Sequence, residues 1–137
     1  MLRPEVIRKR LQKLEEYLSI LERIRGYSHE VFLADPEHYG SAERFLQLGI
    51  EAALDMAMHV IAELELGVVN QGRDIPRLFR EHGYINEALE ARWIQMIGFR
   101  NILVHDYLDV DRDIVYQALQ HDLDDLRLLS KVFAKFL

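Results

Sequence analysis

The stretch SAERFLQLGIEAALDMAMHVIAELEL, residues 41–66, predicts the longest helix of the chain and decides its fold. Apolar side chains recur in it at spacings of three and four residues, which is the periodicity of an amphipathic helix. They form a wide stripe, which consists of Phe45, Leu46, Leu48, Ile50, Ala53, Leu54, Ala57, Met58, Ile61 and Leu64. A stripe of this width predicts a helix that other helices cover on more than one side.

Three further amphipathic segments can provide that cover. Residues 6–24 have apolar side chains at the same spacing, with Pro4 placed for a first helical turn and Gly26 placed to end the helix. Asn86 caps a second segment, which reaches beyond residue 100. The acidic residues at 109–113 favour the start of a last helix, because the helix dipole attracts negative charge there.

Short helices are expected within two of the connections. Ser28 can cap a turn through Leu33, after which DPEHYG at 35–40 should break the chain, and Asp74 should start a short helix. No segment alternates with a period of two, and no internal repeat is present. The sequence therefore predicts an all-α protein, an antiparallel up-and-down four-helix bundle with short extra helices that forms a single domain over residues 1–137.

Composition narrows the class of protein. Half of the 137 residues are hydrophobic and 29% are charged, as in ordinary globular proteins. The absence of cysteine excludes a disulfide framework and cysteine-based zinc or redox sites. The N-terminus has no long apolar segment, and no apolar run of about 18 residues is evident, so we expect a cytoplasmic protein with no membrane partner.

The net charge of −6 argues at first against a nucleic-acid partner, because binding of phosphates needs a basic surface. The charge is unevenly distributed. Residues 106–125 contain seven aspartates and one arginine, so this segment alone has a charge of −7 + 1 = −6 and the remainder sums to zero. The charge balance therefore leaves an RNA partner open for the rest of the chain.

The stretch GFRNILVHDY, residues 98–107, places polar side chains near the end of an apolar helix. On an ideal helix Arg100 and Tyr107 lie within about 20° of each other, and Asn101 and His105 within about 40°. The second pair continues the line of Ile94, Ile97 and Gly98, which should face the bundle or a partner. Buried without partners, these polar groups would cost about 1 to 3 kcal/mol each.

A purely structural interpretation of the same residues stays open. In it, His105 and Asn101 hydrogen-bond to each other or to a neighbouring helix, and Arg100 pairs with a nearby aspartate. The pattern R-x-x-x-x-H-x-Y, formed by Arg100, His105 and Tyr107, favours a functional interpretation instead, because the residue frequencies of this chain give a chance match of only about 2%.

With this pattern late in an all-helical chain, the sequence resembles the HEPN superfamily, and in particular the HepT-like ribonuclease toxins of toxin–antitoxin pairs. The resemblance extends over IEAALDMAMHVIAE, DIPRLFREHGYI and FRNILVHDYLDVDRDIVY. It implies a homodimer and a type VII-like, metal-independent endoribonuclease without a cofactor, whose catalytic residues are Arg100, His105 and Asn101 in the dimer cleft. It also implies a nucleotidyltransferase antitoxin that silences the toxin by attaching AMP to Tyr107.

The chemistry of the residue types agrees with this resemblance. RNA can be cut without a metal when a base removes the proton of its 2′-hydroxyl and a cation stabilises the phosphorane. Histidine suits the proton transfer and arginine the phosphate. Two alternatives remain: a non-catalytic module that binds substrate for the nucleotidyltransferase, and a structural role for the motif as a dimer latch.

Three other clusters of polar residues are candidates for RNA binding or metal binding. Arg73, Arg77 and Arg80 recur on the short helix and can guide an RNA backbone, or pair with acids of a partner. Two sets of residues suggest a metal site at first. The first consists of Glu51, Asp55, His59 and Glu63 on the long helix, and the second of Asp109, Asp111 and Asp113 before the last helix. We predict no metal at either, because the first set fits a solvated or inter-helix polar stripe and the second lacks the glycine and glutamate of a calcium loop.

Overall fold

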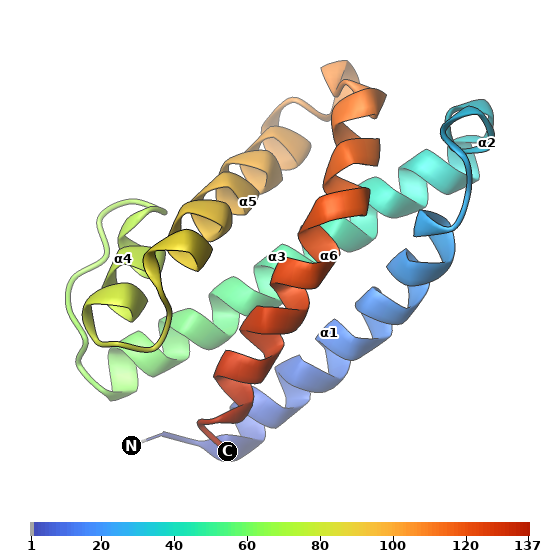
Figure 1. The fold of residues 1–137 in the computed structure, drawn as a ribbon. Helices are drawn as coiled ribbons and strands as arrows, with labels where there is room; N and C mark the ends of the chain where they lie inside the picture. Colours follow the sequence, from blue (N-terminus) through green and yellow to red (C-terminus); the bar gives the residue numbers. More distant parts are fainter. Residues whose placement is uncertain (1) are drawn as a thin grey trace.

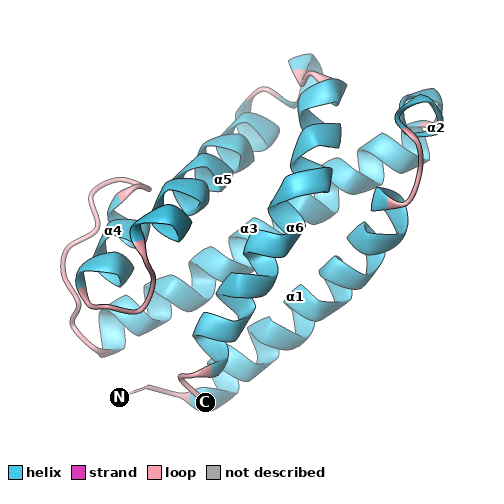
Figure 2. Cartoon of the chain, in the orientation of Figure 1, coloured by secondary structure: helices cyan, strands magenta, loops and turns pink. Residues whose placement is uncertain are grey.

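The computed structural model describes residues 2–137, except for the side chain of Tyr107. Helices joined by loops make up this part of the chain, and no strand occurs within it (Figure 2). The elements are α1 (Pro4–Arg25), α2 (His29–Ala34), α3 (Pro36–Glu63), α4 (Asp74–Glu81), α5 (Glu87–His105), a 3₁₀ turn η1 (Tyr107–Asp109) and α6 (Arg112–Ala134).

The four long helices run alternately up and down, which confirms the predicted antiparallel bundle (Figure 1). The helix α3 is central, since it contacts α1, α5 and α6. The short helix α4 packs against α3 and α5, and α2 lies at the opposite end of the bundle, near the start of α3 and α6 (Figure 1). This arrangement covers the wide apolar stripe of α3, as its sequence predicts.

The start of α3 differs from the prediction. DPEHYG was expected to break the chain, but residues 36–40 form the first turns of α3, which therefore begins at Pro36 and not at Ser41. The carboxylate of Asp35 accepts a hydrogen bond from the Glu37 N–H at 2.9 Å, and Pro36 occupies the first helical turn. Asp and Pro in this order are a helix start, and Gly40 is tolerated inside it.

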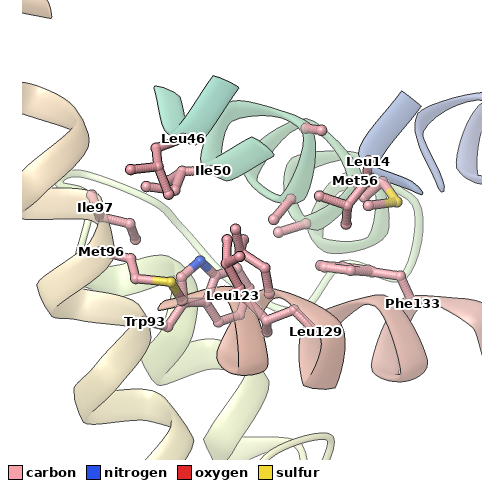
Figure 3. Packing of buried hydrophobic residues seen from close by; sticks show 14 of the residues in the cluster. Leu14, Leu46, Ile50, Met56, Trp93, Met96, Ile97, Leu123, Leu129 and Phe133 are labelled. Atoms are coloured by element: carbon pink, nitrogen blue, oxygen red, sulfur yellow. The ribbon is translucent and has the colours of Figure 1, made fainter. Parts of the chain in front are cut away.

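One hydrophobic core joins the helices. Figure 3 shows Trp93 of α5 close to side chains of α3 and α6, among them Ile50 and Leu123. The Trp93 ring is fully buried and meets Phe79 and Phe133 edge to face, with ring centroids 5.4 Å and 6.1 Å away. This aromatic cluster fixes α5 against the bundle, and so it fixes the position of the segment that follows Trp93.

The helix α3 is long and apolar enough to cross a membrane by length and composition, contrary to the expectation that no segment would be. Half of its most apolar window is buried inside the bundle. Its apolar character therefore matches its place at the centre of the fold.

Candidate active site

The last two turns of α5 present polar groups to solvent. Asn101 and His105 are both exposed, and Gly98 one turn before them is exposed as well. The side chain of His105 makes no hydrogen bond or ion pair with any part of the chain that the structure describes. On the line that the sequence places toward the bundle or a partner, Ile97 is buried in the bundle, whereas Gly98, Asn101 and His105 are exposed. The imidazole of His105 is therefore open to solvent.

Arg100 points the other way, toward α3. Its Nε and Nη2 atoms donate hydrogen bonds to Oε2 of Glu51, at 3.2 Å and 3.0 Å, and its Nη1 donates to Oδ1 of Asn101 at 3.1 Å. Gln47, one turn earlier on α3, donates to the same Glu51 oxygen at 3.3 Å. The guanidinium is therefore held in one orientation, and its remaining N–H groups stay available to a phosphate.

This contact gives Arg100 a different partner from the one that the structural interpretation expected. The acidic partner of Arg100 is a glutamate of α3 and not one of the nearby aspartates. Asn101 accepts a hydrogen bond from Arg100 and makes none with His105. The sequence analysis missed Glu51 as a partner of the motif. The recurrence of Glu51 with Asp55, His59 and Glu63 every four residues on α3 could have indicated an ion pair with another helix. Which helix these residues face depends on how α3 and α5 cross, and the sequence does not give that crossing.

Tyr107 lies outside the helix that carries Arg100. The helix α5 ends at His105, Asp106 has non-helical dihedral angles of −123° and 31°, and Tyr107 begins η1. The expected alignment of Arg100 and Tyr107 on one helical stripe is wrong, because it assumed that α5 continues through residue 107. The prediction for the Tyr107 side chain lies outside the described residues.

The three arginines near α4 differ in their surroundings. Arg77 pairs with Asp74 and Glu81, at 3.3 Å and 2.9 Å, and Arg80 pairs with Glu90 at 2.8 Å. These acids belong to the chain itself rather than to a partner. Within the described residues Arg73 has no acidic partner. Its Nε and Nη2 atoms donate hydrogen bonds to the amide oxygen of Gln71, at 3.2 Å and 3.1 Å.

The loop before α4 is held by Asp74. The backbone N–H groups of Asn70 and Gln71 donate to its carboxylate, at 2.9 Å and 3.0 Å, and Arg77 adds a side-chain contact. These hydrogen bonds, Asn70 first, keep the pKa of Asp74 below its usual range. The carboxylate stays charged at neutral pH and fixes the loop that carries Arg73.

Much of the acidic segment is paired within the fold. Asp124 lies 3.6 Å from Arg25, Asp125 lies 2.7 Å from Arg92, and Asp113 pairs with His29. Asp111 caps α6 by accepting the Asp113 N–H at 2.9 Å, as expected for helix-start charge. These contacts offset part of the negative charge of the segment.

The two sets considered as metal sites have other roles. On α3, Glu51 binds Arg100, Asp55 lies 3.5 Å from Arg10 of α1, and His59 accepts the backbone N–H of Arg3 at 3.2 Å. This is the inter-helix polar stripe that the sequence analysis preferred. No group of three or more His, Asp or Glu side chains in the described part of the chain is arranged to hold a metal ion.

Comparison with known proteins identifies the family. Residues 11–133 match the ribonuclease HepT-like family. The chain belongs to this family. Membership confirms the resemblance noted from the arginine and histidine motif, and with it the prediction that the enzyme class is ribonuclease.

Individual relatives agree with the family. The chain is 38% identical over 80 residues to an mRNA nuclease HepT of Shewanella oneidensis, a match that covers 58% of this chain and 60% of that protein. It is 27% identical over 134 residues to a tRNA nuclease HepT of Aphanizomenon flos-aquae, covering 98% and 91% of the two chains.

Solved structures are similar over nearly the whole chain. The tri-AMPylated HEPN toxin of Shewanella oneidensis in complex with its MNT antitoxin superposes with a TM-score of 0.85 at 28% identity, covering 95% of this chain and 97% of that one. The HepT-like chain thus shares its helical arrangement with a toxin that was captured in an antitoxin complex.

Proposed function

We propose that this HepT-like chain is the toxin of a type VII-like toxin–antitoxin pair and cleaves RNA without a metal, in a cleft between two copies of itself. The observation that carries the proposal is the exposed imidazole of His105, which has no partner among the described residues and lies on the same helix as the oriented Arg100. An mRNA nuclease and a tRNA nuclease among the relatives support RNA as the substrate. Because mRNA and tRNA are present in the cytoplasm, we expect the protein to act there.

Two copies explain why the site lies on an exposed face. Asn101 and His105 form an exposed line at the end of α5, and the apolar side chains of Ile102 and Leu108, close to them in the chain, are 44% and 83% exposed. Apolar side chains exposed beside polar ones are typical of a contact surface. A twofold axis near this line would bring two imidazoles and two guanidinium groups to one cleft.

The proposed reaction divides the work between these groups. One His105 takes the proton from the 2′-hydroxyl, whose oxygen attacks the adjacent phosphorus while the bond to the 5′-oxygen breaks. The His105 of the second copy returns a proton to that leaving oxygen, so the products are a 2′,3′-cyclic phosphate and a 5′-hydroxyl. Arg100 and Asn101 stabilise the negative charge of the phosphorane.

Regulation by a nucleotidyltransferase is the second part of the proposal. The similar Shewanella toxin is tri-AMPylated and bound to an MNT antitoxin. In this chain Tyr107 begins η1, two residues after His105, the last residue of the motif helix α5. AMP attached there would add bulk and negative charge beside the motif and hinder an approaching phosphate.

The test is RNA cleavage by the purified homodimer in the presence of a chelator. We expect cyclic phosphate ends and loss of cleavage in His105→Ala, with the dimer intact in solution. Equal cleavage by the variant would assign the activity to a contaminating nuclease. A monomeric His105→Ala protein would support the dimer latch, and an inactive wild type that still binds the nucleotidyltransferase would support the non-catalytic module.

A further inference from the structure

A shallow groove lies beside the motif, between α5 and the loop that precedes α4. Its volume is about 420 Å³. Its floor is formed by Ile94, Ile97 and Gly98, and its rim by Arg73, Gln71 and Asn101. Asn101, at one end of this lining, is one helical turn before His105 on α5, so the groove lies next to the motif.

The floor of the groove is apolar and open. Ile97 is buried, Ile94 is partly exposed, and a Cβ atom added to Gly98 would meet no heavy atom within 4 Å. An apolar surface of this kind suits the face of a nucleobase, which gains affinity by contact with apolar side chains.

The rim supplies charge and a link to the motif. Arg73 is the one arginine of the set Arg73, Arg77 and Arg80 without an acidic partner among the described residues. Asp74 holds its loop in place by accepting two backbone N–H groups. On the opposite rim, Asn101 is hydrogen-bonded to Arg100 at 3.1 Å, so a molecule in the groove reaches the motif directly.

We propose that this groove is a nucleotide subsite for single-stranded RNA, in which Arg73 binds a phosphate next to the one that is cleaved and the floor around Gly98 receives an unpaired base. The inference rests on the proposed ribonuclease function. It assigns Arg73 to the subsite and leaves Arg77 and Arg80 to their ion pairs. A paired base cannot reach the floor, because its faces are covered within a duplex.

The first test measures binding of a single-stranded oligoribonucleotide in a His105→Ala background, which prevents cleavage. We expect Arg73→Ala to weaken binding about tenfold and to lower the slope of log affinity against log salt by about one. The matched control is Arg23→Ala on α1, an exposed arginine with no ion pair among the described residues, which should bind as the background does.

The second test adds side chains to the floor of the groove at Gly98. Gly98→Ala and Gly98→Leu both favour the helix, so both should fold. We expect Gly98→Leu to raise KM for single-stranded RNA about tenfold with little change in kcat, and Gly98→Ala to raise KM by a smaller factor, because it adds a smaller side chain to the floor. Gel filtration of both variants shows whether the dimer is retained, which separates a blocked groove from a lost interface.

Unchanged affinity and KM in Arg73→Ala and Gly98→Leu would overturn the subsite, and so would equal binding of single-stranded RNA and a duplex of the same sequence. A different result would contradict the ribonuclease function: the wild type would cleave no RNA, or His105→Ala would cleave it equally well. The binding measurement decides on the groove in either case.

Discussion

Glu51 of α3 binds the guanidinium of Arg100 of α5 through both Nε and Nη2, at 3.2 Å and 3.0 Å. The contact links two residues that are 49 positions apart in sequence. It orients the arginine, and it also offsets the charge that a phosphate would use. These two effects on catalysis have opposite signs, and kinetics can separate them.

Substitution Glu51→Gln tests this relationship. We expect kcat to fall about tenfold, or about 1.4 kcal/mol, because the guanidinium loses its fixed orientation. KM for RNA should fall too, because the positive charge is no longer offset. The control is Asp55→Asn, one turn further along α3, where the acid pairs with Arg10 instead. A variant with unchanged kcat would show that Glu51 does not position Arg100.

Substitution Tyr107→Phe tests the proposed modification. After incubation with ATP and the nucleotidyltransferase, the wild type should gain the mass of one or more AMP groups and lose cleavage. Tyr107→Phe should gain none and remain active, while Tyr116→Phe on α6 should be modified like the wild type. Mass spectrometry gives the result, and an AMP group found on Tyr107→Phe would place the modification elsewhere.

Stability should depend on pH through Asp122. Burial, and next the nearby charge of Asp125, raise the pKa of Asp122 from 3.8 to about 6, while His121 opposes the shift. The folded state therefore holds this proton more tightly than the unfolded state. The free energy of unfolding gains from it below pH 3.8 and loses that gain as the pH rises to about 6.

Asp122→Asn removes this loss. We expect the variant to be more stable than the wild type by about 2 kcal/mol at pH 7.5, after allowance for partial exposure of the side chain, and equally stable near pH 3.5. Urea unfolding at several pH values measures the difference. Asp124→Asn is the control, because its side chain is 73% exposed. A constant difference at all pH values would contradict the account.

Trp93→Ala should test the aromatic cluster that fixes α5. The side chain is fully buried, so its removal should lower the free energy of unfolding by about 3 to 5 kcal/mol. Val68→Ala changes a side chain that is 72% exposed and should stay within about 0.5 kcal/mol of the wild type. Similar values for the two variants, measured by urea unfolding, would mean that the cluster contributes little.

The helices could be predicted because their signals are local. Apolar residues at spacings of three and four, Gly26 after α1 and Asn86 before α5 act within a few residues of the chain. The error at the start of α3 was local too. There the Asp35 and Pro36 pair was interpreted as a break, although the same pair caps a helix.

By itself the sequence determined the all-helical class, the four long helices and the motif of Arg100 and His105, because periodicity, caps and residue order are properties of neighbouring residues. Only the tertiary structure decided that Glu51 holds Arg100, that Arg73 alone of its set borders the groove without an acidic partner among the described residues, and that Tyr107 leaves the helix. These outcomes depend on how α3, α4 and α5 cross, and crossing is set by the packing of side chains far apart in the chain.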